Sequence, residues 1–365
     1  LTCSLVMYNF TNGGNDGGKV SRTIMKFERR LGGQMGSIRY FQKCVSCHPD
    51  SGKPVKRPNI QWFLVMWYLH LHIFGAYGII LLLTTAKWTT VLFTLFITLT
   101  SILGVTAGAH RLWAHRSYQA SGLLKFFLIM AHTMAGVGPI YDWVLAHRMH
   151  HQFYGTEHDP YNHKHGFVYS HYISNVIKYH PDFDKMKASV DMRDLEKDLY
   201  IWIQKNFYWI LFPIFGVLLP LNAPFEYWDE SLTICFCCLG FLRFVLTVNA
   251  SWLVNSAVLI WSVKLEENYI VFFVTKSCWP IYHYMVPWDW KSGEYGSYNG
   301  GCSTFFIKMW SELGLVSELQ TTTSEEIRDI LYEMVCNNTS WKENLAKLEN
   351  SAKLRGKTEK LKAFL

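Results

Sequence analysis

Long uncharged stretches alternate with polar stretches along the chain. The first uncharged stretch runs from Pro58 to Ala86, and its apolar part, residues 62–83, is long enough to cross the roughly 30 Å hydrocarbon core of a bilayer. After the single Lys87, residues 88–109 are again uncharged. Because only a tight turn separates the two segments, the pattern predicts two membrane-spanning helices arranged as an antiparallel hairpin.

A second pair of apolar segments lies in the second half of the chain. Residues 207–221 are interrupted by Pro213 and Pro220, and residues 231–257 contain one charged residue, Arg243. These segments predict a third and a fourth spanning helix. Four spans return the chain to the side of the membrane where it began, so both termini are expected on the same side.

The segments outside these spans are polar or short. Residues 123–138 are apolar but too short to span, and they contain Lys125 and His132, which favours a buried or interfacial helix. Residues 139–205 are rich in His, Asp and Lys, which predicts a water-facing domain between the two hairpins. The predicted fold is an all-α membrane protein with four transmembrane helices, in two hairpins, and a helical cap.

The two ends of the chain differ from this central unit, residues 58–320. Residues 1–57 are basic, rich in Gly and without sustained periodicity, so we expect a largely disordered cytosolic arm, and its start lacks the pattern of a signal peptide. In residues 321–365, Thr323 and Glu326 have the spacing of a capping box. This spacing predicts a short C-terminal helix followed by a frayed tail.

Composition and charge agree with a membrane location. Half of the residues are hydrophobic and 17% are charged, whereas about a quarter of the residues are charged in soluble proteins. The net charge of +7 comes from Lys and Arg outside the apolar segments. We attribute it to the positive-inside rule rather than to nucleic-acid binding, and therefore place both termini in the cytosol. The nine cysteines, three of them inside an apolar segment, indicate no disulfide framework.

Two local motifs carry little weight. Cys44, Cys47 and His48 match the pattern of c-type haem attachment, but the sequence around them does not resemble a haem domain and we do not assign the motif. Residues 337–339 match a glycosylation sequon. The predicted topology places them in the cytosol, so we discount the sequon.

Histidines are concentrated near the predicted membrane exits. His110 and His115 are five residues apart, so on a straight helix their rings would diverge, as they would if they served two metals or if the second followed a helix end. His147, His150 and His151 lie at positions i, i+3 and i+4, which share one helix face, so these rings can converge on one point. Neutral imidazoles bind iron, copper or zinc, and iron suits oxygen activation. A lone histidine is more often a hydrogen-bonded surface residue, but five in two clusters predict a two-metal cradle.

Three segments that include these histidines resemble the animal acyl-CoA desaturases. GAHRLWAHRSYQA (108–120) and DWVLAHRMHHQF (142–153) are similar to the first two histidine boxes of that family, and NASWLVNSA (249–257) is similar to its fourth span. PWDW (287–290) and STFFI (303–307) extend the resemblance towards the C-terminus. The spacing alone also admits sterol and sphingolipid hydroxylases, but the residues around the histidines favour the acyl-CoA branch.

The resemblance implies an activity, its cofactors and its site residues. The activity is that of a stearoyl-CoA 9-desaturase type of enzyme, which uses oxygen to insert a cis double bond into a saturated fatty acyl-CoA at the endoplasmic reticulum membrane. The family holds two iron ions on nine histidines and receives electrons from cytochrome b5. Carried over by motif, the metal ligands are His110, His115, His147, His150, His151 and His283. Asn255 would hold a metal through a water molecule, and Lys178 and Trp252 would contact the substrate.

The chain departs from the family in its last third. Leu259, Pro280 and Tyr284 stand where the resemblance places three further histidines, with the Tyr284 phenol as a candidate replacement. Ala146 replaces an acidic residue, and the segment after the fourth span is shorter than in the family. We therefore expect partial iron loading and weak or absent desaturation. Three explanations stay open: a gene-model error near residues 258–280, a non-catalytic paralogue that binds acyl-CoA or an active desaturase partner, and an active variant site.

Overall fold

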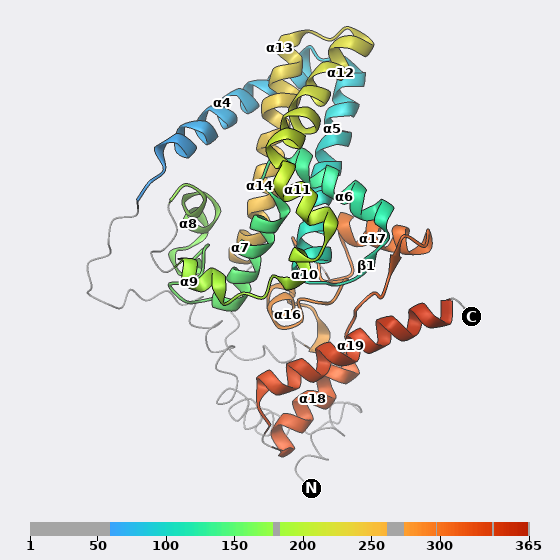
Figure 1. The fold of residues 1–365 in the computed structure, drawn as a ribbon. Helices are drawn as coiled ribbons and strands as arrows, with labels where there is room; N and C mark the ends of the chain where they lie inside the picture. Colours follow the sequence, from blue (N-terminus) through green and yellow to red (C-terminus); the bar gives the residue numbers. More distant parts are fainter. Residues whose placement is uncertain (1–58, 178–182, 261–273, 297, 338, 364–365) are drawn as a thin grey trace, which may run out of the picture.

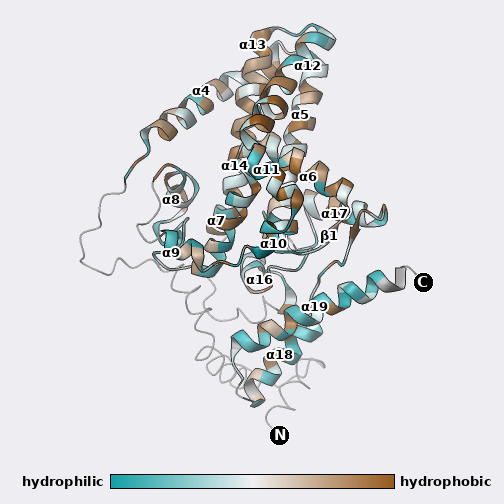
Figure 2. Cartoon of the chain, in the orientation of Figure 1, coloured by the Kyte–Doolittle hydropathy of each residue, from teal (hydrophilic) through white to brown (hydrophobic). Residues whose placement is uncertain are grey.

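The computed structural model describes residues 59–177, 183–260, 274–296, 298–337 and 339–363. Four helices are long and apolar enough to cross a membrane: Trp62–Thr84, Trp88–Ala114, Leu199–Trp228 and Leu232–Leu259. Figure 1 shows the last three upright in a bundle, with the first leaning away at its N-terminal end and shorter helices gathered beneath. Apolar residues dominate the bundle and hydrophilic residues the part beneath it (Figure 2). The predicted all-α membrane fold with four spanning helices is confirmed.

Two helical hairpins form the bundle. The first consists of α4 (Trp62–Thr84), α5 (Trp88–Leu103) and the π-helical segment η1 (Gly104–Ala114). The second consists of α11 (Leu199–Leu211), η4 (Phe212–Leu218), α12 (Leu219–Trp228), α13 (Leu232–Ile234), η5 (Cys235–Leu242), α14 (Arg243–Ser256) and η6 (Ala257–Leu259). Because α4 packs against η5 and α5 packs against α14, the two hairpins interlock.

The third spanning helix is longer than predicted. It begins at Leu199 rather than at residue 207, because the polar Gln204 is buried and paired. The Gln204 side chain accepts a hydrogen bond from the backbone nitrogen of Ile140 at 3.0 Å and donates one to Thr133 Oγ1 at 3.3 Å. The predicted polar domain therefore ends before Leu199.

Helices α6 (Gly122–Ala135) and α7 (Ile140–Phe153) carry the chain from the first hairpin to the second histidine cluster. The Ser121 side chain caps α6 by accepting a backbone hydrogen bond at 3.3 Å, and Gly136, with a φ of 71°, ends it. The chain then bends by 85° into α7. The short helix predicted near residues 123–138 is present, with one face buried and apolar side chains exposed on the other.

Short helices and a small sheet complete the part beneath the bundle. The helices are η2 (His163–His165), α8 (Phe167–His171), η3 (Ile173–Asn175), α9 (Phe183–Ala188), α10 (Arg193–Glu196), α16 (Trp279–Met285) and α17 (Cys302–Glu312). The strands β1 (Gln119–Ala120) and β2 (Val316–Ser317) pair antiparallel, with Gln119 opposite Ser317. This pairing ties the end of the first hairpin to the chain that follows α17.

The C-terminal segment forms two helices, α18 (Ser324–Asn337) and α19 (Trp341–Ala363). The capping box is confirmed, because the backbone nitrogen of Thr323 donates to the Glu326 carboxylate at 2.8 Å and the backbone nitrogen of Glu326 donates to Thr323 Oγ1 at 3.2 Å. The predicted frayed tail is wrong. Leu348 of α19 is buried in one cluster with residues of α18. This contact stabilises α19, whose few apolar positions did not predict a helix. The N-terminal arm, with Cys44, Cys47 and His48, lies outside the described residues.

Gly104 allows a close contact between the start of η1 and α6. A Cβ atom at this position would meet the backbone of His132 and would lie 2.5 Å from the carbonyl carbon of Ala131. We expect Gly104→Ala to destabilise the protein by about 1–3 kcal/mol, because backbone cannot yield as a side chain can. Gly240→Ala is the matched control, since its Cβ would meet only side chains, at 3.5 Å or more. Thermal unfolding in detergent measures both, and equal midpoints would contradict this account.

Candidate metal centre

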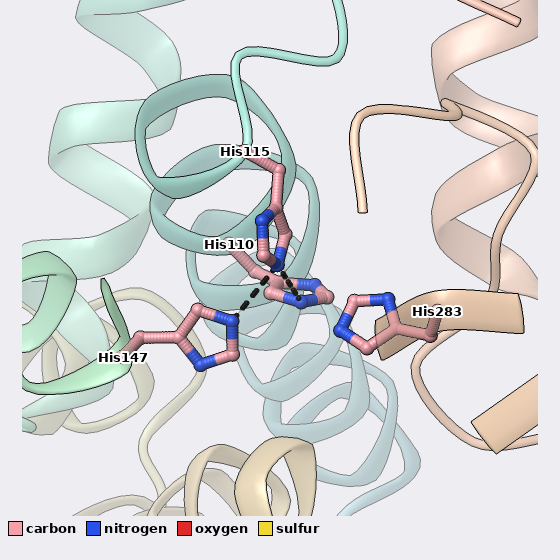
Figure 3. Close-up of side chains that lie close together, drawn as sticks. All are labelled: His110, His115, His147 and His283. Atoms are coloured by element: carbon pink, nitrogen blue, oxygen red, sulfur yellow. Dashed lines mark hydrogen bonds between the residues drawn. The ribbon is translucent and has the colours of Figure 1, made fainter. Parts of the chain in front are cut away.

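Four histidines bring one ring nitrogen each to a common point. They are His110 in η1, His115 just after it, His147 in α7 and His283 in α16, and the four nitrogens lie within 4.8 Å of one another. Figure 3 shows the four rings directed inward from these separate elements. In the part of the chain that the structure describes, no other set of three or more His, Cys, Asp or Glu side chains converges in this way. We call these residues the four-histidine group.

The π-helical winding of η1 explains why His110 and His115 meet. Rings five residues apart point in different directions on an α-helix, which has 3.6 residues per turn. In a π-helix the backbone hydrogen bonds join residues five apart, and here the nitrogen of His115 donates to the carbonyl oxygen of His110 at 3.0 Å. The two Nε2 atoms are 3.1 Å apart, and His115 Nε2 lies 2.9 Å from His147 Nε2. The structure has no straight α-helix here, and His115 follows the last residue of η1, which is the predicted alternative of a second ring after a helix end.

The outer nitrogens of His110 and His147 are held by acceptors. His147 Nδ1 donates to Oδ1 of Asn255 at 2.7 Å, and His110 Nδ1 donates to the Glu294 carboxylate at 3.2 Å. Because a neutral imidazole carries one proton, both Nε2 atoms present lone pairs to the centre of the group. Such outer partners orient metal-binding histidines in proteins. The role of Asn255 as a water-bridged ligand stays a prediction.

Glu294 and Arg111 support this arrangement, and the sequence did not identify either of them. The buried Arg111 guanidinium donates to both oxygens of Glu294, at 2.5 and 2.9 Å. Burial acts to raise the pKa of Glu294, but Arg111 and His110 hold that pKa at about 2. Glu294 is 184 residues from His110 and belongs to no motif, so no spacing signal could have found it.

The three histidines of the second box divide between two places. The His151 ring lies 4.8 Å from the ring of His147, which belongs to the four-histidine group. The His150 ring is 6.1 Å from that of His147; its Nδ1 lies 2.8 Å from a carboxylate oxygen of Asp159 and its Nε2 lies 2.6 Å from the Tyr284 hydroxyl. On an α-helix, positions i+3 and i+4 lie on opposite sides of position i, about 100° apart. The convergence of all three rings on one metal stays a prediction, and in this structure both nitrogens of His150 have partners of their own.

Burial keeps the rings around the centre neutral. Desolvation is the largest influence and neighbouring imidazoles come second, and together they hold the pKa well below its ordinary value for His115, His147, His151 and His283. Nε2 of His151 is also buried, and within the described part of the chain it has no hydrogen-bond partner. Neutral imidazole is the form that ligates metals. The centre therefore fits a metal cation at neutral pH.

Of the three positions where the resemblance predicts a missing histidine, Tyr284 contacts His150. Tyr284 donates its hydroxyl to His150, and it packs with Leu259 in one apolar cluster around Trp279. Pro280 is buried in the first turn of α16. The four-histidine group brings its nitrogens together, whereas Nε2 of His150 pairs with the hydroxyl of Tyr284.

The predicted substrate contacts are only partly described. Trp252 is buried on α14, and its ring packs edge-on against Tyr68 with centroids 4.8 Å apart. Lys178 lies outside the described residues, as does most of the short segment after the fourth span. The roles of Trp252 and Lys178 in substrate binding stay predictions.

The fold and the centre define a multi-pass helical membrane protein with a histidine-rich site that could hold a metal. No family model matches the chain. The chain is 36% identical over 283 residues to an acyl-CoA Delta-9 desaturase of Acheta domesticus, covering 75% of this chain and 79% of that protein. It is 34% identical over 297 residues to an acyl-CoA Delta12-desaturase of the same organism, covering 78% and 83%, and 33% identical over 288 residues to the stearoyl-CoA desaturase of Homo sapiens, covering 77% and 80%. The chain belongs to the acyl-CoA desaturase family, which confirms the family predicted from the sequence.

Replacing Glu294 by Gln tests whether the buried ion pair of Arg111 and Glu294 stabilises the centre. We expect Glu294→Gln to destabilise the protein by about 3–5 kcal/mol, because Arg111 would stay buried without an ionised partner. The matched control is Glu157→Gln, whose side chain is 64% exposed and pairs with Lys164 at 3.1 Å, an exposed pair worth about 0–1 kcal/mol. Chemical denaturation in detergent gives both free energies of unfolding. If Glu294→Gln lowers the free energy of unfolding no more than Glu157→Gln does, the buried pair of Arg111 and Glu294 does not stabilise the centre.

Proposed function

We propose that the chain is an oxygen-dependent acyl-CoA desaturase that inserts a cis double bond, at the delta-9 position, into a saturated fatty acyl-CoA. The observation that carries the proposal is the four-histidine group beneath a bundle of four spanning helices. Relatives named Delta-9 desaturase and stearoyl-CoA desaturase support the delta-9 position, although Delta12 and Delta(11) enzymes are relatives as well.

The proposal includes two iron ions as cofactors. The four-histidine group would hold one of them, because its four nitrogens converge in a largely buried place and the Nε2 atoms of His110 and His147 carry lone pairs on the inner side. Iron bound there supplies oxygen activation and the abstraction of hydrogen from an unactivated methylene, chemistry that belongs to the metal. The chain contributes orientation and exclusion of water: Glu294 and Asn255 hold the outer nitrogens of His110 and His147.

The fatty acyl chain has to be held close to this centre for reaction. Trp143 links α7 to α14, because its indole nitrogen donates to Ser251 Oγ at 2.8 Å while its ring stacks on that of His147 with centroids 5.3 Å apart. Trp252 follows Ser251 directly on α14. An acyl chain in contact with Trp252 would therefore lie close to Ser251, which binds the Trp143 ring that stacks on His147. Lys178 would attract the acidic coenzyme A group.

The remaining parts of the proposal concern the cellular setting. Cytochrome b5 would deliver electrons, and the protein would lie in the endoplasmic reticulum membrane with both termini in the cytosol. The basic N-terminal arm and the even number of spanning helices support this orientation.

A second candidate is a non-catalytic paralogue that binds acyl-CoA or an active desaturase. The observation that favours it is the hydrogen bond from Tyr284 to His150, which occupies a nitrogen that the family resemblance assigns to a metal. Lost outer partners alone lower metal affinity or activity about 10–100-fold, so the missing ligands are expected to lower the rate of desaturation.

Expression in a yeast strain that lacks its own desaturase tests the proposal. We expect weak or no growth without added unsaturated fatty acid for the unaltered chain. Leu259→His, Pro280→His and Tyr284→His together should increase growth and cis-delta-9 products, because they restore the ligands. In this restored background, His147→Ala should abolish the products, and His158→Ala, at an exposed position, is the matched control.

The outcomes separate the two candidates. A folded, restored variant that forms no unsaturated product would contradict the desaturase assignment and favour the non-catalytic paralogue. Robust growth on the unaltered chain would contradict the predicted impairment while supporting the assignment. Gas chromatography of the fatty acids reports the position of the double bond.

A further inference from the structure

His163, in η2, is a buried histidine outside the four-histidine group, and only 1% of it is exposed. Its Nε2 lies 2.7 Å from the backbone carbonyl oxygen of Asn255. Because a carbonyl oxygen only accepts, Nε2 carries the proton and Nδ1 of the neutral ring carries a lone pair. Nδ1 is buried and has no hydrogen-bond partner among the residues that the structure describes. A buried acceptor without a partner is costly, so its presence calls for an explanation.

The ring of His163 lies beside that of His150, with centroids 4.7 Å apart. Nδ1 of His150 donates to the Asp159 carboxylate at 2.8 Å, so the lone pair of His150 is on Nε2. The Tyr284 hydroxyl donates to that Nε2 at 2.6 Å. Elements α7, η2 and α16 thus place the buried ring of His163 and the half-buried hydroxyl of Tyr284 beside the ring of His150.

This place adjoins positions where the family's histidines are missing. Tyr284 itself occupies one such position and packs in one cluster with Leu259, which occupies another. Asn255, which anchors His163, lies one helical turn before Leu259. His163 therefore contacts the end of α14 from a separate segment. It does so close to Leu259, whose side chain offers no ligand atom.

We propose that His150 Nε2, His163 Nδ1 and the phenolate oxygen of Tyr284 form a second iron site, in which His163 and Tyr284 replace lost histidine ligands. This inference rests on the proposed function and names the ligands of its second metal. On binding, the phenol O–H bond breaks, a metal–oxygen bond forms and the proton leaves to water, with no change of oxidation state. Imidazole suits iron, and proteins also bind iron through tyrosine.

Iron content and visible absorption of the purified full-length chain, incubated with an iron salt, test this site. We expect more than about one iron per chain and, with ferric iron, a phenolate-to-iron absorption band. Tyr284→Phe should remove the band because it deletes the phenol oxygen alone. His163→Ala should lower the content towards about one iron per chain, because a lost ligand weakens metal binding. His165→Ala, at an exposed position in the same short helix, is the matched control and should change neither readout.

Several results would overturn the second site. They are an unaltered chain that binds iron without the band, a band that persists in Tyr284→Phe, and an iron content that is the same in His163→Ala as in the unaltered chain. The last result would mean that a water, rather than a metal, accompanies Nδ1 of His163. Because Tyr284→Phe removes one atom, it tests the site even if His163→Ala does not fold. Failure of the proposed function would look different. The unaltered chain would still show the absorption band, but the restored variant, tested in yeast, would form no unsaturated product.

Discussion

Two rings five residues apart diverge on an α-helix, but they meet here because η1 is wound more widely at the end of the second spanning helix and His115 follows its last residue. This winding directs His110 and His115 towards His147 and His283, which come from separate elements. With α-helical winding one of these two rings would turn away from the other. The close packing at Gly104 fixes where this segment begins relative to α6.

In four of the buried imidazoles, a hydrogen-bond acceptor holds the outer ring nitrogen. The pairs are His110 with Glu294, His147 with Asn255, His150 with Asp159, and His163 with the carbonyl oxygen of Asn255. The inner lone pairs are thus oriented by the protein itself. Lone pairs crowded in a buried site lower stability unless something binds them, and a cation satisfies them together.

The sequence predicted the spanning helices well, because the thickness of a bilayer sets their length, and it predicted the histidines through the spacing of their boxes. It missed what depends on partners from distant segments. Gln204 extends the third helix because its partners lie on α6 and α7, and α19 is stable because it packs on α18. The winding of η1, the partner Glu294 and the buried His163 have no signature in a single sequence, since each follows from contacts formed only in the folded chain.

The central claim is that the four-histidine group holds iron. The most direct test is a crystal structure of the purified, iron-loaded chain, with anomalous scattering measured on both sides of the iron absorption edge. The account predicts an anomalous peak, present only above the edge, among the ring nitrogens of His110, His115, His147 and His283. A well-ordered group of these four rings without such a peak would contradict it.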